Sequence, residues 1–229
     1  MTDLVTSSGL TKPTARRTLG ALVRAGLLDQ DDASRRYHLG AESCVLGMLA
    51  ARRFGIHARA IDGLTRLSQA TGDTAFLSVR RDLHIVCFHR EEGPFPIRSH
   101  VLQVGDRHPL GIGAGSLAVL AALPDDEVER AIAANTAIIL EKYPAYSAGL
   151  LQSAVLRTRK EGYALNPGLL MKGSWGIGVA VCDPRGRPVY AISLAAIEDR
   201  LDEVRRLELI PMLKREAEKL ERLLRDAPA

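Results

Sequence analysis

The sequence predicts an α+β protein in two parts, a small basic N-terminal part and a larger part built on antiparallel strands. Three observations support this prediction. A basic amphipathic helix is followed by a short hairpin within the first 40 residues. Two pairs of apolar strand-like runs, at 75–90 and 175–195, are each joined by a tight turn. Helical patterns flank these pairs, and 229 residues suffice for one sizeable domain and a small one.

Composition and charge narrow the class of protein. Hydrophobic residues make up 46% and charged residues 25% of the chain, as in a soluble globular protein. No apolar run approaches the ~20 residues of a membrane span, and the first residues lack a secretory pattern. We therefore expect a cytoplasmic protein with no membrane association. Residues 1–40 hold six Lys/Arg against four Asp/Glu, whereas the rest hold 25 against 23, so the basic excess is concentrated at the N-terminus.

The first informative stretch is Ser8–Leu28, which predicts a turn, a basic helix and a helix stop. Gly9 suits the turn, Thr11 can cap the helix, and Gly26 can end it in a left-handed conformation. One face of the helix is apolar and the other is basic, as in a helix that reads DNA. The apolar face holds Ala15, Leu19, Leu22 and Val23, and the candidate DNA contacts on the helix are Lys12, Thr14, Arg16, Arg17 and Arg24. An ordinary amphipathic helix with a solvated basic face is the alternative, because such patterns are degenerate.

Residues 27–40 favour the DNA-binding interpretation. They predict two short strands around the acidic turn 30–34, and a hairpin directly after a recognition helix is a wing. Arg35 and Arg36 on that wing could reach the phosphate backbone.

These features together resemble the N-terminal winged helix-turn-helix of the IclR-type bacterial transcriptional regulators. The matching residues are Gly9, Leu10, Lys12, Thr14, Arg17, Leu19, Leu22, Gly26, Leu27, Leu28, Tyr37, Leu39 and Gly40. The resemblance implies a partial winged domain over 1–40, a linker helix over 41–55 and a GAF-like effector-binding domain over 56–229. One departure is that relatives carry another full helix, and a longer second one, before this point. Either the natural start lies upstream of Met1, or the winged domain is weakened by several kcal/mol of lost burial, at roughly 1.5–3 kcal/mol per apolar side chain.

The larger part begins with a helix expected over 57–71, with Ala60, Leu64 and Leu67 on its buried face. Strands are expected over 75–80 and 83–90, with a third over 95–102. Later segments predict helices over 125–135, 147–161 and 202–225, with Leu150, Leu156 and Val155 or Ala154 in the core of the second. A pocket loop is expected from Asn166 to Ser174, followed by a closing hairpin of strands over 175–183 and 188–195.

A glycine-rich loop that leads into an apolar helix, 104–120, is the second informative stretch. Backbone N–H groups at a helix N-terminus can bind a carboxylate when no side chain covers them, as in a glycine-rich segment. The alternative interpretation is a tight loop with a purely structural role. The segment resembles the loop that lines the effector pocket of the IclR family, and 160–164 resembles another of its signatures. Carried over position by position, the resemblance places these residues at the effector site: Leu110, Gly113, Ala114, Asn166, Met171, Trp175, Gly176, Ser193 and Ala195. The apolar members favour an aromatic or otherwise bulky acid.

Enzymatic and metal chemistry are not indicated. There is no G-x-S-x-G, H-E-x-x-H or Walker sequence, and Cys44, Cys87 and Cys182 are too far apart for a C-x-x-C site. We therefore expect no catalytic site, metal site or cofactor. The leading hypothesis is a regulator that binds operator DNA as a homodimer or tetramer and senses a small organic acid. The alternatives are a small-molecule-binding and dimerisation module that has lost DNA binding, and an enzyme on the same fold.

Overall fold

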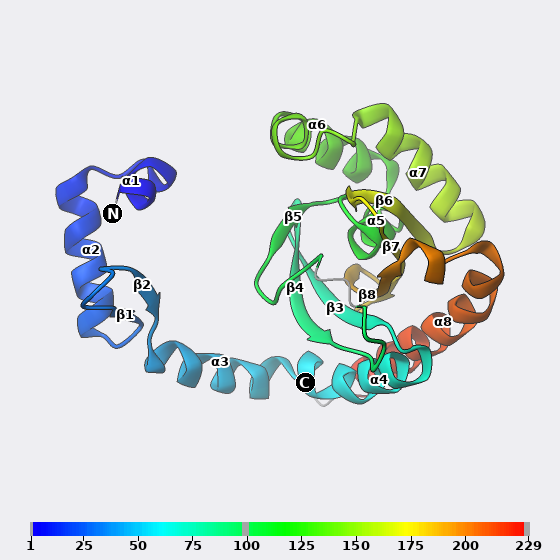
Figure 1. Ribbon diagram of the computed structural model, residues 1–229, viewed down its shortest axis with the longest axis horizontal. Coiled ribbons are helices and arrows are strands. Elements are labelled where there is room, and N and C mark those ends of the chain that lie inside the picture. Colours follow the sequence, from blue (N-terminus) through cyan, green and yellow to red (C-terminus); the bar gives the residue numbers. More distant parts are fainter. Residues whose placement is uncertain (1, 98–100, 227–229) are drawn as a thin grey trace. The chain divides into compact units, whose positions relative to one another are not determined.

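The computed structural model describes residues 2–97 and 101–226. The chain divides into two compact units, Met1–Gly55 and Ile56–Ala229. The N-terminal unit contains three helices and one hairpin in its described residues (Figure 1). Their bounds are α1 Thr2–Ser8, α2 Lys12–Arg24, β1 Leu28–Gln30, β2 Tyr37–Leu39 and α3 Ala41–Phe54.

Helix α2 begins and ends close to where the sequence predicts. Gly9 and Gly26 both take a left-handed conformation, with φ of 65° and 70°, and Pro13 lies in the first turn, where its missing N–H costs nothing. Thr11 is the N-cap residue, but its hydroxyl bonds the Thr14 hydroxyl (3.0 Å) rather than a backbone N–H. The predicted side-chain cap is therefore wrong.

The hairpin is held against α2 at a contact that only glycine permits. A Cβ on Gly40 would lie 2.1 Å from the carbonyl oxygen of Gly26. The Gly40 and Glu42 N–H groups donate to Leu27 and Gly26 respectively, and the Ser43 hydroxyl also donates to Leu27 (2.8 Å). The end of α2, the hairpin and the start of α3 consequently form one hydrogen-bonded junction.

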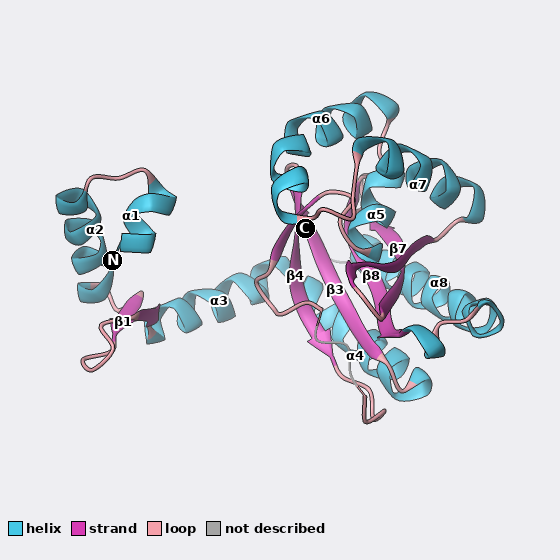
Figure 2. Ribbon diagram, turned by 45° about the horizontal axis from the view of Figure 1, so that its top comes forward, coloured by secondary structure: helices cyan, strands magenta, loops and turns pink. Residues whose placement is uncertain are grey.

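The C-terminal unit is built on one six-stranded antiparallel sheet with the order β5-β4-β3-β8-β7-β6 (Figure 2). Its strands are β3 Thr74–Arg81, β4 His84–Glu91, β5 Arg107–Pro109, β6 Ala164–Met171, β7 Ser174–Cys182 and β8 Pro188–Ile197. Its helices are α4 Ile56–Thr71, α5 Ala114–Ala121, α6 Asp125–Lys142, α7 Ala148–Glu161 and α8 Glu203–Arg225, with a 3-10 turn η1 at Glu198–Arg200. The predicted α+β class, with helices flanking an antiparallel sheet, is confirmed.

Two apolar clusters hold the layers together. Helices α4 and α8 pack with β3, β7 and β8 in one cluster, which includes Leu64, Leu67 and Leu213. Helices α5, α6 and α7 form the other with Ile85 and Ala191 of the sheet. Helix α5 is buried along its whole length, because the sheet and α7 both pack against it.

A buried ion pair joins the two ends of this unit. The Asp73 carboxylate, 3% exposed, accepts from Arg200 Nε at 2.9 Å and from Arg205 Nη2 at 2.6 Å. Both arginines also donate to the carbonyl of Thr71, and Arg200 stacks on Phe95 with its Cζ atom 3.7 Å from the ring centroid. The pair thus joins the turn after α4 to the segment before α8.

Four local expectations are wrong. Residues 95–97 and 101–102 form no strand, and 98–100 lie outside the described residues; β5 pairs with β4 instead. Pro94 and Pro96 lack the N–H that a strand ladder needs. Residues 164–171 form the edge strand β6 rather than a pocket loop, and α6 continues to Lys142. On α7, Leu156 is 67% exposed, while Leu151, Ala154 and Val155 are buried.

We expect Asp73→Ala to lower the free energy of unfolding of this unit by about 3 kcal/mol, because two partly buried guanidinium groups lose their carboxylate. Chemical denaturation followed by the fluorescence of Trp175, the single tryptophan, measures it. The control is Asp125→Ala: Asp125 also pairs with an arginine, Arg159, but its side chain is 82% exposed. That change should cost less than about 1 kcal/mol, and equal losses would contradict a structural role for the Asp73 pair.

Candidate functional site

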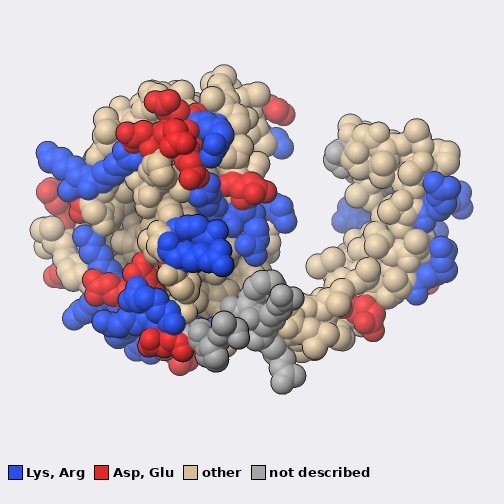
Figure 3. Space-filling view, turned by 180° about the vertical axis from the view of Figure 1, so that it is seen from behind, with Lys and Arg blue, Asp and Glu red and all other residues tan. Residues whose placement is uncertain are grey.

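All of the predicted DNA-contacting side chains except that of Thr14 are exposed. Figure 3 shows lysine and arginine side chains on the surface of the N-terminal unit. Five of them line a groove between α2 and the hairpin: Lys12, Arg16, Arg24, Arg35 and Arg36. The described lining of this groove contains no acidic residue. Arg17 is exposed on α2 outside this groove, and Thr14 is half-buried. The helix and the wing therefore present one cationic surface.

The tip of the wing is an ordered turn. The Asp31 side chain accepts from the Ser34 N–H at 2.6 Å, and Ser34 holds the pKa of this carboxyl below its usual value. Arg35 has a left-handed backbone, with φ of 55°, and its carbonyl accepts from the Gln30 side chain. These bonds fix the direction in which the wing arginines leave the backbone.

A cavity of about 40 Å³ lies between the first turn of α5 and one face of the sheet. The strand register brings side chains from all six strands to this face. The members from the strands include His108 of β5, Ile85 and Cys87 of β4, Phe76 and Ser78 of β3, Ser193 and Ala195 of β8, Gly176 of β7 and Asn166 of β6. Leu102, Ile112, Leu170 and Trp175 complete the apolar walls.

Helix α5 lies directly on β7 at a point where only glycine fits. A Cβ on Gly178 would lie 2.8 Å from three backbone atoms, the carbonyl carbon and oxygen of Ala114 and the nitrogen of Gly115. Real Cβ atoms essentially never approach backbone that closely. The missing side chain at Gly178 therefore sets how near the α5 N-terminus comes to the sheet.

That close approach brings hydrogen-bond donors together. The N–H groups of Ala114 and Gly115 belong to the first turn of α5 and have no acceptor within the helix. Ser193, 6% exposed, has its hydroxyl beside this turn, 3.2 Å from where a Gly115 Cβ would lie. Within the described residues its hydroxyl makes no hydrogen bond, so it can serve a ligand.

A buried tyrosine orients the remaining polar group. The Gly113 N–H donates to the Tyr146 hydroxyl at 3.2 Å, and that hydroxyl donates to Asn166 Oδ1 at 3.2 Å. The Leu169 N–H donates to the same oxygen. Because Asn166 Oδ1 accepts two bonds, the side-chain NH₂ of Asn166 is left as a donor at the cavity. Sequence reasoning expected a direct contact to an acid from Gly113, but Tyr146 already accepts from that N–H.

The cavity is uncharged. No Lys, Arg, Asp or Glu is found among the described residues that line it. Burial raises the pKa of Tyr146 to about 12 and that of Cys87 to about 12, so both stay protonated at neutral pH. Desolvation lowers the pKa of His108, which keeps its imidazole neutral. The site therefore offers neutral donors with no negative charge beside them.

Seven of the nine residues expected at the effector site line this cavity: Gly113, Ala114, Asn166, Trp175, Gly176, Ser193 and Ala195. Leu110 does not line it, because its side chain is fully buried in the apolar core under α5 and α7. Met171 is 49% exposed, because a bulge in β6 after Pro167 turns Leu170 toward the cavity instead.

Sequence reasoning missed Tyr146, His108 and the sheet residues Phe76, Ser78 and Cys87. The alternation of the two predicted strands could have placed the last three on one face. Tyr146 and His108 lie in irregular or very short segments with no motif, so no local signal indicated them.

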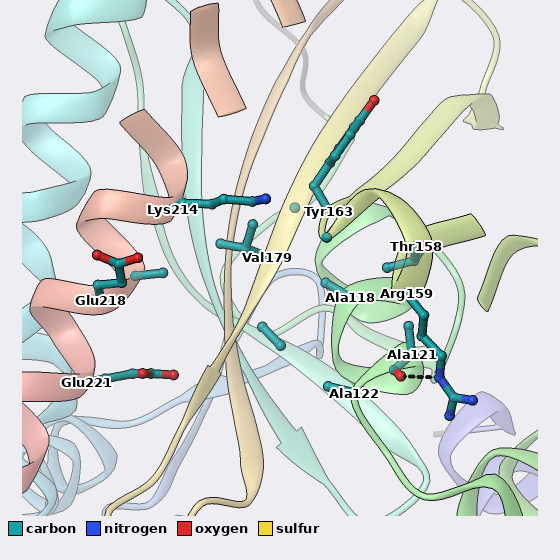
Figure 4. A pocket seen from close by; sticks show the side chains of 14 residues that line it. Ala118, Ala121, Ala122, Thr158, Arg159, Tyr163, Val179, Lys214, Glu218 and Glu221 are labelled. Carbon is teal, nitrogen blue, oxygen red and sulfur yellow. Dashed lines mark hydrogen bonds between the residues drawn. The ribbon is translucent and has the colours of Figure 1, made fainter. Parts of the chain in front are cut away.

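A second groove, of about 350 Å³, lies where α5 and α7 face α8 across β7 (Figure 4). Its base is made of alanines, with Tyr163, Lys214, Glu218 and Glu221 around it. The Arg159 guanidinium already makes hydrogen bonds within the protein: its Nε donates to the carbonyl of Ala121 at 2.8 Å, and its Nη2 donates to the carbonyl of Leu123. None of the predicted effector residues lines this groove.

Comparison with known proteins identifies the architecture. Residues 48–222 match the family described as "Bacterial transcriptional regulator IclR C-terminal", and residues 1–32 match the "IclR helix-turn-helix domain". The chain belongs to the IclR family. The glycerol operon regulatory protein of Streptomyces coelicolor is 30% identical to this IclR-family protein over 88% of this chain and 78% of that one. This protein is accordingly a transcriptional regulator rather than an enzyme.

Solved IclR-family structures share the fold. One is an IclR-type regulator from Silicibacter, with a TM-score of 0.84 and 21% identity over 100% of this chain and 89% of that one. Another is an IclR homolog from Microbacterium hydrocarbonoxydans in complex with 4-hydroxybenzoate, with a TM-score of 0.79 and 19% identity over 99% and 91% of the two chains. None of the helices in the described part of this IclR-family chain is long and apolar enough to cross a bilayer.

We expect Gly178→Ala to lower the free energy of unfolding of the C-terminal unit by about 1–3 kcal/mol, because the new methyl group forces α5 away from β7. Denaturation followed by Trp175 fluorescence measures the effect. Gly149→Ala on α7 is the matched control, since no atom lies within 4 Å of its new Cβ. It should leave stability unchanged or raise it by up to about 1 kcal/mol. Equal behaviour of the two variants would contradict the close contact.

Proposed function

We propose that this regulator binds operator DNA through α2 and the hairpin wing, and that a small carboxylic acid in the cavity under α5 controls that binding. The exposed cations of the N-terminal unit support the first half of the proposal. Phosphate contacts from Lys12 and the wing arginines would position the protein, and side chains on the outward face of α2 would contact base edges.

A homo-oligomer is the second part of the proposal. Helix α3 leaves apolar side chains open to solvent, with Met48 58% and Leu49 57% exposed beside Val45 and Leu46. A contiguous exposed apolar face of this kind marks an interaction surface. A second copy of the same helix covers it most simply, and two-fold assemblies also suit paired half-sites on DNA.

The effector's acid group is inferred from the donor set of the cavity, which carries this proposal. The N–H groups of Ala114 and Gly115, the Ser193 hydroxyl and the Asn166 amide all offer hydrogens, and the described lining contains no carboxylate. A carboxylate accepts several such bonds and is stabilised at a helix N-terminus. Asn166 contributes because its amide, unlike an aspartate, does not repel an anion.

An aromatic or otherwise bulky acid fits the walls better than a two-carbon acid. Phe76, Ile85, Leu170 and Trp175 offer mostly apolar surface, against which a small polar ligand would leave donors unpaired. The present free volume of about 40 Å³ holds one or two waters. Binding of an aromatic acid would therefore move partly buried side chains such as Leu102 and Leu170 outward. A relative of the same fold with 4-hydroxybenzoate is consistent with such a ligand.

For DNA, we expect Arg17→Ala to weaken specific binding by about 1–3 kcal/mol, because α2 loses a side chain that faces outward. Arg35→Ala on the wing should cost less and should mainly reduce the dependence of binding on salt. Mobility shifts with the native upstream promoter measure both, with Arg185→Ala, an exposed arginine in the β7–β8 turn, as the control. Unchanged binding of Arg17→Ala would contradict its assignment, and a wild type with no specific binding would favour a module that only binds ligand and dimerises.

For the effector, we expect Gly113→Glu to abolish binding of aromatic acids, because its carboxylate would occupy the anion site. Gly113 has φ of 84°, so the change also strains the backbone. The control therefore carries the same charge and the same strain: Gly186→Glu, at φ of 75° in the β7–β8 turn, has no atom within 4 Å of its new Cβ.

Calorimetry with a panel of acids measures both variants. Binding that survives Gly113→Glu would exclude the loop from the site. Binding of only glyoxylate- or pyruvate-sized acids would contradict the size argument.

A further inference from the structure

A buried imidazole nitrogen at the cavity is left unused by the proposed acid site. His108 lies on β5, paired in register with Ile85, and its imidazole lines the cavity. Its Nδ1 atom bonds the Tyr143 hydroxyl at 2.9 Å. Its Nε2 atom is buried and has no hydrogen-bond partner among the described residues. A buried nitrogen without a partner is costly, so it marks a place where a ligand atom would be favourable.

The chemistry of this imidazole limits the group it can bind. Desolvation lowers the pKa of His108, so the ring is neutral and has one donor and one acceptor nitrogen. If the Tyr143 hydroxyl donates to Nδ1, Nε2 is the donor; if the hydroxyl accepts, Nε2 is the acceptor. A ligand hydroxyl can satisfy either arrangement, because it both donates and accepts. A second carboxylate satisfies only one of them.

The position of His108 sets the length of the ligand. Ser193 is on β8, and the sheet order places β4 and β3 between β5 and β8. Three strand spacings of about 4.8 Å separate the two strands, and the register also offsets the two residues along the strands: His108 lies level with Arg80 of β3, whereas Ser193 pairs with Phe76. The His108 and Ser193 side chains nevertheless both line the cavity. A two- or three-carbon acid is too short to bond both ends. An acid with a rigid ring between its two polar groups spans more of this separation and keeps the two groups apart.

We propose that His108 Nε2 binds a hydroxyl group at the far end of the effector, while the α5 N-terminus, Ser193 and Asn166 hold its carboxylate. The effector class is therefore an elongated hydroxy acid, such as a ring-hydroxylated aromatic acid. This inference rests on the proposed acid-binding function of the same cavity. It adds a specificity-determining residue that neither the sequence motifs nor the resemblance indicated.

The experiment compares two acids that differ only in the distal hydroxyl, 4-hydroxybenzoate and benzoate, by calorimetry on the full chain. For the wild type we expect 4-hydroxybenzoate to bind about tenfold more tightly, because benzoate leaves Nε2 unpaired. In His108→Phe, which keeps the ring volume, the ratio should fall to about one through weaker binding of 4-hydroxybenzoate. His108→Gln retains a donor and an acceptor and should restore part of the ratio.

His84→Phe is the matched control, because His84 is a half-buried histidine on neighbouring β4 that does not line the cavity. It should leave the ratio at its wild-type value, and thermal melts should show that every variant folds. Two results would overturn the role of His108 and leave the acid-binding proposal standing. One is equal binding of the two acids by the wild type, and the other is an affinity ratio that His108→Phe does not change. If the wild type bound other acids but neither of these two, the hydroxyl assignment would fall and the acid site would stand. If no acid bound, both proposals would fail.

Discussion

The cavity depends on the contact between Gly178 of β7 and the first turn of α5. With no side chain at Gly178, the backbones of Ala114 and Gly115 rest almost directly on the strand. The α5 N–H groups then lie beside the Ser193 hydroxyl on the next strand, β8. Any residue with a Cβ at 178 would separate helix and sheet and disperse these donors. One steric constraint therefore supports both the packing of α5 and the chemistry of the site.

The proposed recognition of an acid relies on neutral groups held in place rather than on a positive charge. Tyr146 links Gly113 of the helix to Asn166 of the edge strand, and burial keeps its hydroxyl protonated. The Asn166 amide is oriented by hydrogen bonds made within the protein, and the N–H groups of α5 are fixed by the helix, so these donors lose little conformational entropy when a ligand binds. A lysine or arginine in the same apolar cavity would itself be costly to bury. Preorganised neutral donors avoid that cost, and such a site selects its ligand by shape as well as by charge.

The two units differ in how much apolar surface each buries within itself. The C-terminal unit has two large apolar clusters and the Asp73 ion pair. Along α2 of the N-terminal unit, only Ala15 and Leu19 are buried, and the apolar side chains of α3 face solvent. Folding free energy scales with apolar burial, so the smaller unit has much more to gain from a partner surface. Assembly through α3, as proposed, would stabilise the N-terminal unit and bring two copies of it together.

The local elements of this protein were predictable from the sequence because their signals are local. Helical periodicity, and glycines that adopt left-handed conformations at 26 and 162, set where α2 and α7 end. The glycine-rich run before Ala114 likewise predicted a helix N-terminus. Tertiary structure alone decided the rest. Asn166-Pro167-Gly168 has the composition of a loop, yet it forms an edge strand because β7 supplies its ladder bonds. In a strand a shift of one residue reverses which side chains face inward, and the bulge in β6 therefore brings Leu170 rather than Met171 to the cavity. His108 and Tyr146 reach the site only because the folded sheet and the loop before α7 bring together segments that are far apart in the chain.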